Sequence, residues 1–252
     1  MTPQIPQYVL SLESILRPVV MTIALGLIWL GAARMPAAAK SRYTTAGVLS
    51  LALIGWEVAA QYLGAANTYL ATLDSPPAVP TILFGLLIPL AVAAIALWRS
   101  ESIARLVSAI PLHWLVAAQI YRVGGGIFLV LWADGRLPWQ FALPAGTGDV
   151  ITGIVAPIVA VRLAQNAMGA HRAAYAWCLF GIGDLVVAVA MGAMTSPGPV
   201  HLLALDAPNL LMTTYPLVMV PTFAVPLALM LHGLVLLRLQ RNAAATRRLA
   251  AA

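Results

Sequence analysis

Seven long apolar runs divide the sequence and constrain its fold more than any other feature. Each has about the 20 residues that an α-helix needs to cross the hydrocarbon core of a bilayer. The predicted spans cover residues 14–33, 44–64, 79–98, 110–132, 143–163, 172–193 and 216–238. The sequence therefore predicts a single all-α domain over residues 1–252, a bundle of seven transmembrane helices in a multi-pass membrane protein.

Composition also indicates a lipid environment. Hydrophobic residues make up 62% of the chain and charged residues 9%, whereas soluble domains have about half and about a quarter. The net charge of +6 is concentrated in short segments between the apolar runs, which is typical of a cytoplasmic membrane face. We expect the lipid bilayer as a partner and no nucleic acid. The sequence indicates neither a particular oligomeric state nor a cofactor.

The distribution of charge predicts the orientation of the bundle. Basic residues gather in the first, third and fifth connections and in the C-terminal tail, whereas the intervening connections hold mainly Asp74, Asp134 and Asp206. Short loops rich in Lys and Arg stay in the cytoplasm, so we expect the N-terminus outside and the C-terminus inside. Lysine occurs once, at Lys40, against many arginines. That bias favours a GC-rich bacterial genome and the bacterial inner membrane.

Two segments are expected to be neither simple loops nor spans. Residues 99–109 alternate charged and apolar side chains at helical spacing, which predicts a short interfacial helix on the cytoplasmic side. Residues 194–215 are too long for a tight turn and too apolar for a free loop. We expect them to pack over the outer mouth of the bundle, as a lid or a partly re-entrant segment.

Ionisable and amide side chains inside the spans form the candidate functional site. A charge at the centre of a membrane helix costs roughly 2.5–3.5 kcal/mol, so each needs a partner or a function. At about 1.5 Å of rise per residue, those in this chain share one layer in the outer half of the membrane. The expected substrate- or proton-binding cluster consists of Arg122, Asp149, Asp184, Glu57, Gln119 and Gln61.

Acidic groups outnumber basic groups in this layer. Three carboxylates accompany one guanidinium, that of Arg122, and both desolvation and like charge favour proton binding by a buried carboxylate. This imbalance predicts a titratable site. The alternative is a structural ion pair between Arg122 and one carboxylate, which would fix the order of the helices without binding a ligand.

The chain between Arg122 and Asp149 is expected to form an outer vestibule next to this cluster. Pro138 and Pro144 with neighbouring glycines fix the turn into the fifth span. The three glycines at 124–126 indicate close helix contact or a local kink. The remaining residues expected to border the vestibule are Asp134, Arg136, His201 and Asp206.

Histidine and cysteine patterns do not favour a metal or thiol site. No two histidines are spaced to place two ligands on one helix face, so we expect no metal. His201 and Asp206 fit solvated loop residues better than a weak metal site, and His232 fits a hydrogen-bonded core histidine. The single cysteine, Cys178, excludes a disulfide or a paired-thiol mechanism within one chain.

Asp149 and Asp184 end two matching tetrapeptides, Gly-Thr-Gly-Asp at 146–149 and Gly-Ile-Gly-Asp at 181–184. Glycines let helices approach closely, so we expect the two carboxylates to face each other across the fifth and sixth spans. The pair resembles the GxGD motif of intramembrane aspartyl proteases, which implies two aspartates that share a proton and activate water. The chain departs from that family where Gly148 replaces a tyrosine, and where residues 226–229 (Pro-Leu-Ala-Leu) stand for its Pro-Ala-Leu element.

Three functions fit these features. The first is a small membrane transporter or permease that binds a small solute or a proton at Arg122, Asp149 and Asp184. The second is a membrane-embedded aspartate-dependent enzyme, a GxGD-like protease or a lipid-acting hydrolase. The third is a non-catalytic subunit that binds a protein partner or a hydrophobic cofactor such as a quinone or a carotenoid. A retinal protein is excluded because the last span lacks a lysine for the Schiff base.

Overall fold

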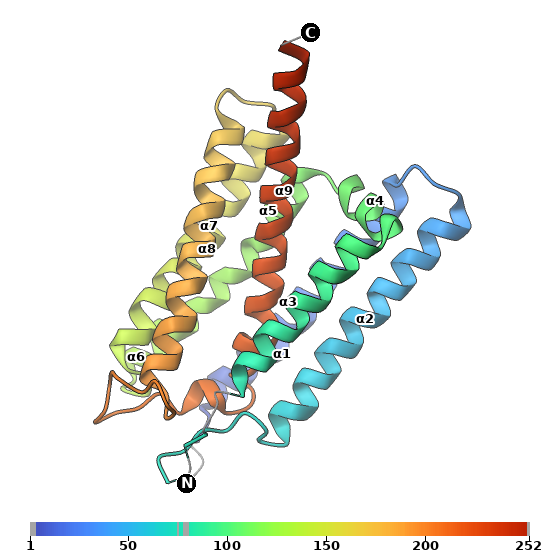
Figure 1. The fold of residues 1–252 in the computed structure, drawn as a ribbon. Helices are drawn as coiled ribbons and strands as arrows, with labels where there is room; N and C mark the ends of the chain where they lie inside the picture. The colour runs from blue at the N-terminus through green and yellow to red at the C-terminus, as the bar shows by residue number, and fades with distance from the viewer. Residues whose placement is uncertain (1–3, 75, 78–80, 251–252) are drawn as a thin grey trace.

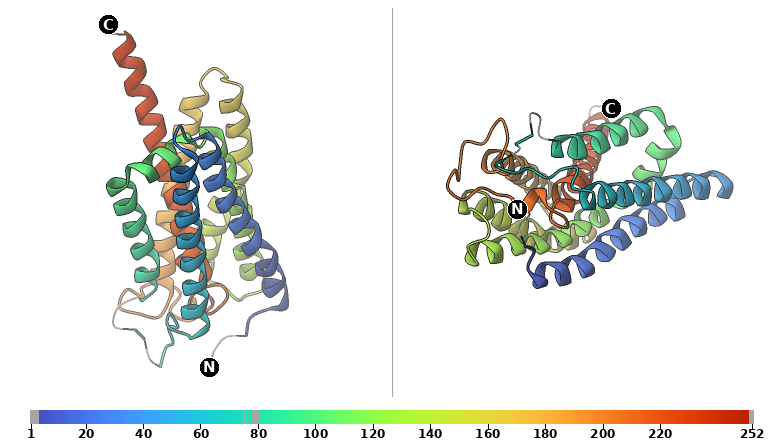
Figure 2. Two further views of the ribbon diagram at one scale, coloured as in Figure 1. Left: turned by 90° about the vertical axis from the view of Figure 1, so that its right-hand side faces the viewer. Right: turned by 90° about the horizontal axis from the view of Figure 1, so that it is seen from below.

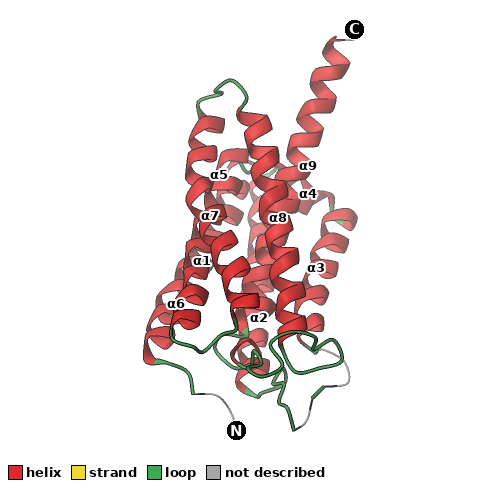
Figure 3. Cartoon of the chain, turned by 90° about the vertical axis from the view of Figure 1, so that its left-hand side faces the viewer, coloured by secondary structure: helices red, strands yellow, loops and turns green. Residues whose placement is uncertain are grey.

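The chain is built from helices that run up and down beside one another (Figure 1). The computed structural model describes residues 4–74, 76–77 and 81–250, and this part of the chain contains no strand (Figure 3). The N-terminus lies at one end of the bundle and the C-terminus at the other (Figure 1). The fold is therefore all-α, as predicted.

Seven helices are long and apolar enough to cross a membrane. The fourth, Leu112–Ala133, and the seventh, Val220–Ala243, are composite. The α-helical ones are α1 (Gln7–Arg34), α2 (Ala39–Ala65), α3 (Ile82–Arg99), α7 (Trp139–Ala164) and α8 (Ala170–Thr195). The fourth joins α5 (Leu112–Ala117), the 3-10 helix η1 (Ala118–Gly126) and α6 (Ile127–Ala133). The seventh begins with the π-helix η3 (Val220–Ala224) and continues into α9 (Val225–Ala250).

Each predicted apolar run forms a helix, although the ends shift. The first helix begins at Gln7 rather than at residue 14. Two polar residues of its first turns form hydrogen bonds within the helix: the hydroxyls of Ser11 and Ser14 donate to carbonyl oxygens of the preceding turn at 3.1 and 2.8 Å. The expected start of the third helix, at residues 79 and 80, lies outside the described residues. That these helices cross a membrane remains a prediction.

A short amphipathic helix, α4 (Glu101–Ala109), follows α3. Ser100 caps it, since its hydroxyl accepts a hydrogen bond from the backbone N–H of Ile103 at 3.3 Å. Leu106 is fully buried against Gly31 of α1. The helix predicted within residues 99–109 is thus confirmed, and its place at a membrane interface remains a prediction.

The core lies between α1, α5, α7, α8 and α9. Contacts are most extensive where α7 meets α8 and η1. Helix α3 lies at the edge of the bundle (Figure 2), and Leu86 is the buried residue that it contributes. The tightly packed half of the molecule therefore contains α7, α8 and η1, which carry Arg122, Asp149 and Asp184.

The connection from α8 to η3 covers the end of the bundle near the N-terminus. The backbone N–H groups of Leu202 and Leu203 donate to the carbonyl of Met194 at 2.9 Å, and that of Asn209 donates to Thr195 at 2.8 Å. The connection includes the short 3-10 helix η2 (Leu211–Thr213), whose residues are buried. As expected for residues 194–215, the segment packs onto one mouth of the bundle.

Candidate functional site

Arg122 lies on the 3-10 helix in the middle of the fourth candidate span. The three glycines at 124–126 weaken the preference for α-helix there, since glycine is among the poorest helix formers. A 3-10 helix has three residues per turn, so side chains three positions apart line up. Gln119, Arg122 and Gly125 therefore share one face, which points toward α7 and α9.

Arg122 binds two carboxylates and two neutral acceptors. Its Nε donates to Oδ1 of Asp149 at 2.6 Å, and its Nη2 donates to Oδ2 of Asp184. Its Nη1 lies 3.3 Å from the carbonyl oxygen of Gly181 and 3.1 Å from Nε2 of His232. Arg122 is 3% exposed, so these contacts replace the water that a buried guanidinium loses. The structure thus brings Arg122, Asp149 and Asp184 together.

The two aspartates occupy different environments. The side chain of Asp149 is 17% exposed and that of Asp184 is 6% exposed. Asp149 lines two cavities, whereas Asp184 lines neither of them. The guanidinium of Arg122 bridges the carboxylates through different nitrogen atoms. An ion-pair bridge therefore occupies the place where the GxGD resemblance implies a shared proton.

The glycines of the two tetrapeptides make room for this network in specific places. A Cβ atom on Gly148 would overlap the carboxylate of Asp184, and one on Gly181 would lie 2.5 Å from Nε2 of His232. A Cβ on Gly183 would meet nothing within 4 Å. The two glycines that directly precede the aspartates are therefore not equivalent, because only Gly148 is required for close approach.

His232 and Cys178 extend the hydrogen-bond network away from the carboxylates. A guanidinium can only donate, so Nε2 of His232 accepts from Arg122 and the imidazole is neutral with its proton on Nδ1. That Nδ1 lies 3.3 Å from Sγ of Cys178, whose thiol donates to the carbonyl of His232 at 3.3 Å. His232 is fully buried. The prediction of a hydrogen-bonded core histidine is confirmed.

Two side chains of η1 tie it to the start of the last helix. Nε2 of Gln119 donates to the carbonyl oxygen of Ala228 at 3.0 Å, and the hydroxyl of Tyr121 donates to the carbonyl oxygen of Ala224 at 3.3 Å. Gln119 is fully buried. It lies on the same helix face as Arg122 but bonds to backbone, so it positions η1 against α9 and η3.

Glu57 and Gln61 belong to a second charged group, which corrects the expectation of one shared cluster. Nε2 of Gln61 donates to Oε1 of Glu57, and that oxygen lies 3.9 Å from Nε of Arg17 on α1. Nε of Arg17 also lies 3.4 Å from Oε1 of Glu13. Depth along a helix does not fix the direction of a side chain around the bundle. Helix α2 packs against α1 and α4, and its polar face meets α1.

The residues expected around an outer vestibule lie at the end of the bundle instead. Asp134 accepts a hydrogen bond from the Tyr8 hydroxyl at 2.6 Å, and Nη1 of Arg136 donates to the carbonyl of Gln4 at 3.3 Å. Asp149 lies ten residues inside α7, about 15 Å along its axis, which separates it from the turn. We expected four residues to border a vestibule beside Asp149, but none of them lines either of the two cavities that Asp149 lines: Asp134, Arg136, His201 and Asp206.

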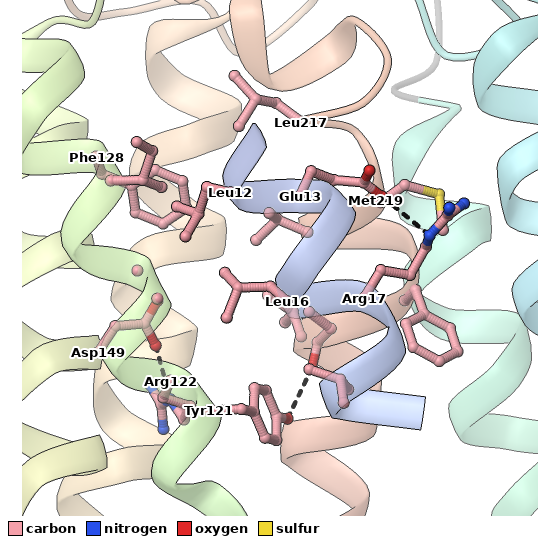
Figure 4. A pocket seen from close by; sticks show the side chains of 18 of the residues that line it. Leu12, Glu13, Leu16, Arg17, Tyr121, Arg122, Phe128, Asp149, Leu217 and Met219 are labelled. Carbon is pink, nitrogen blue, oxygen red and sulfur yellow. Dashed lines mark hydrogen bonds and ion pairs between the residues drawn. The ribbon is translucent and has the colours of Figure 1, made fainter. Parts of the chain in front are cut away.

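Two mainly apolar cavities meet at Asp149. The first, of about 140 Å³, lies between α1 and the segments η1, α7, η3 and α9 (Figure 4). The second, of about 90 Å³, lies between α3, α8, η3 and the connection that covers the bundle end. Four apolar side chains line both cavities together with Asp149: Phe128, Leu185, Val220 and Val225. Asp149 is the carboxylate that both cavities share.

The first cavity includes two charged residues that sequence reasoning missed. Glu13 and Arg17 of α1 line it opposite Arg122 and Asp149 (Figure 4). The available signal was their spacing, since residues i and i+4 share one helix face. Within the described residues, no group of three or more His, Cys, Asp or Glu side chains is arranged to hold a metal ion.

The chain matches the model of a known protein family. A family model with the description "Domain of unknown function (DUF8737)" matches residues 78–240, more than half of the chain. The matched region contains Arg122, Asp149 and Asp184, whereas α1 and α2 precede it. No curated protein and no solved structure matches the chain.

Proposed function

We propose that this chain, which belongs to the DUF8737 family, is a proton-linked membrane transporter that carries a small solute through the two cavities. The observation that carries the proposal is the position of Asp149. It is the carboxylate that lines both cavities, and it is anchored to the buried Arg122. A buried carboxylate that is reached from two cavities and held by a fixed counter-charge is suited to binding and releasing a proton or a charged solute.

Insertion with the N-terminus outside and the C-terminus in the cytoplasm is part of this proposal. Large apolar side chains are exposed along the long helices, for example Leu51, Val92 and Ile158 at 72, 60 and 57%. Water would disfavour such a surface, and lipid would solvate it. The connections at the end that carries the C-terminus bear the basic residues, which supports a cytoplasmic location for that end. The abundance of arginine over lysine supports a bacterial inner membrane.

The charge balance around Asp149 supports a link to protons. Two carboxylates bind one guanidinium, so the ionised group carries one uncompensated negative charge. Arg122 and Asp184 face Asp149 directly, His232 is neutral, and Glu13 and Arg17 lie across the first cavity. A buried negative charge without a counter-ion is costly. Binding a proton or a positively charged solute would remove that cost.

Departures from α-helix lie beside the cavities. The π-helix η3 supplies Val220, Phe223 and Ala224 to the first cavity, and the 3-10 helix η1 supplies Tyr121, Arg122 and two glycines. Such segments often mark functional positions in helices. Both adjoin the apolar side chains that line both cavities, so a change in the conformation of either segment would alter access to Asp149.

A hydrophobic cofactor site in a non-catalytic subunit is the second candidate, and the apolar lining of both cavities favours it. An extract of the purified protein would then contain a stoichiometric quinone or pigment, detectable by absorbance and mass spectrometry. The transporter proposal predicts a protein that is colourless and free of such a molecule.

Solute-driven proton movement tests the proposal. The protein is reconstituted into vesicles that contain a pH-sensitive dye and is offered a panel of small cationic, neutral and anionic solutes. We expect at least one solute to change the internal pH with the wild type and with Asp134→Asn, which alters an exposed carboxylate at the bundle end. We expect no change with Asp149→Asn. Transport that persists in Asp149→Asn, or a panel that gives no signal, would contradict the proposal.

A further inference from the structure

Two charged groups lie on opposite sides of the first cavity. Arg122 and Asp149 lie on one wall, and Glu13 and Arg17 of α1 lie on the other (Figure 4). Apolar side chains of α1, such as Leu12 and Leu16, line the space between them (Figure 4). The cavity is therefore apolar in its middle and charged at both walls.

The charged group around Arg17 has the same composition as the group around Arg122. Arg17 has two carboxylate neighbours, Glu13 at 3.4 Å and Glu57 at 3.9 Å. The side chain of Glu57 is 9% exposed and also accepts from Gln61. Each charged group thus combines two carboxylates with one guanidinium, and one carboxylate of each group, Glu13 or Asp149, lines the cavity.

Neutral polar groups around the cavity do not change this balance. Burial raises the pKa of Tyr215, which lies near the α1 wall, and the carboxylates of Glu13 and Glu57 raise it further. The phenol therefore stays neutral at neutral pH. His232 is neutral because its Nε2 accepts from Arg122. The two charged groups together hold four carboxylates and two guanidiniums, which gives a net charge of −2 when all are ionised, and Glu13 and Asp149 are the carboxylates that line the cavity itself.

Aromatic rings add a second preference for positive charge. Tyr121, Phe128 and Phe223 line the same cavity. The face of an aromatic ring attracts a cation, and this interaction strengthens when the site is dry. The apolar walls and aromatic rings of the cavity, together with the carboxylate excess of the two adjoining charged groups, favour an organic cation with an apolar body.

We infer that the first cavity binds a small hydrophobic organic cation, with Asp149 and Glu13 as the charged contacts on its two walls. The inference rests on the proposed function, because it names the class of solute that would pass the cavity. The apolar body of the cation would contact the leucines and the aromatic rings, and its charge would offset the carboxylate excess.

Calorimetric titration of the detergent-purified full-length protein tests this inference. The probe is benzyltrimethylammonium, which carries a permanent charge and an aromatic body. Neopentylbenzene has the same shape without the charge, and benzenesulfonate carries the opposite charge. We expect the cation to bind about tenfold or more tightly than either analogue, since removing one partner of a buried charge pair costs at least that much.

Substitutions on each wall locate the site. Glu13→Gln and Asp149→Asn should each weaken binding of the cation about tenfold or more, whereas Asp134→Asn should leave it unchanged. Melting temperatures of the variants show that each is folded. The inference is overturned if the neutral isostere or the anion binds as tightly as the cation, if no probe binds, or if the folded Glu13 variant binds normally.

The result separates this inference from the proposed function. Proton movement driven by a neutral or anionic solute, without cation binding, would retain the transporter and reject the cation. Cation binding at the two walls without any solute-driven proton movement would retain the site and reject the transporter. The two experiments therefore fail independently.

Discussion

Replacing the glycine before each aspartate with alanine should have opposite effects on stability. In Gly148→Ala the new methyl group would overlap the carboxylate of Asp184, which Arg122 binds. In Gly183→Ala the methyl group would meet nothing within 4 Å. The two substitutions are chemically identical and occupy the same position of matching tetrapeptides, so each is a control for the other.

The expected magnitudes follow from packing. Alanine in a helix interior is favoured over glycine by roughly 0.5–1 kcal/mol, so Gly183→Ala should stabilise the protein by up to that amount. An extra methyl group in a filled site costs about 1–3 kcal/mol. Gly148→Ala should also displace Asp184 from Arg122. The helix preference is common to both variants and cancels between them, so we expect them to differ by about 1–3 kcal/mol in free energy of unfolding, toward the upper end because Asp184 is displaced.

The single cysteine supplies the assay. Cys178 is the only cysteine of the chain and is buried, so a thiol-reactive fluorescent dye labels the protein in detergent as it unfolds. At about 2–4 °C per kcal/mol for a chain of this size, the melting temperatures should differ by on the order of 10 °C, with Gly148→Ala the lower. Equal melting temperatures for the two variants would refute the packing argument.

Three further predictions concern the network and the orientation. Arg122→Gln should lower the free energy of unfolding by about 3–5 kcal/mol, because it leaves two buried carboxylates without a counter-charge; a change below 1 kcal/mol on the thiol-dye assay would contradict this. His232→Leu should cost about 1–3 kcal/mol through the lost acceptor, and His232→Gln, which keeps an acceptor, should cost less in the same assay. The orientation is tested in a chain whose Cys178 is changed to alanine. A membrane-impermeant maleimide should label Asp206→Cys in intact cells, and should label Met168→Cys, a position 95% exposed in the wild type, only after permeabilisation. The reverse labelling pattern would show the opposite orientation.

The helices were predictable because a run of about 20 apolar residues carries a strong and local signal. The grouping of Arg122 with Asp149 and Asp184 was also accessible, since few buried charges exist and each needs a partner. The assignment of Glu57 to that group was wrong because depth along a helix says nothing of the direction in which a side chain points. Its neighbour Arg17 was overlooked at the start of the first apolar run.

Local irregularities were the least predictable features. The glycines at 124–126 indicated close contact or a kink, yet the structure has a 3-10 helix over Ala118–Gly126. The π-helix η3 begins beside Pro221, and a single proline does not specify which irregular turn will form. These conformations depend on contacts with other helices, such as the bond from Gln119 to Ala228, which no local sequence pattern encodes.

The 3-10 segment allows the length and the rotation of the fourth helix to change together. Each of its residues rises about 2.0 Å and turns about 120°, compared with about 1.5 Å and about 100° in an α-helix. Every residue that returns to α-helix shortens the helix by about 0.5 Å and rotates all that follows by about 20°. A change from 3-10 helix to α-helix over a few residues before Arg122 would therefore rotate its guanidinium relative to Asp149 while the fourth helix stays continuous. The position of the positive charge is set by the pitch of the backbone as much as by the groups around it.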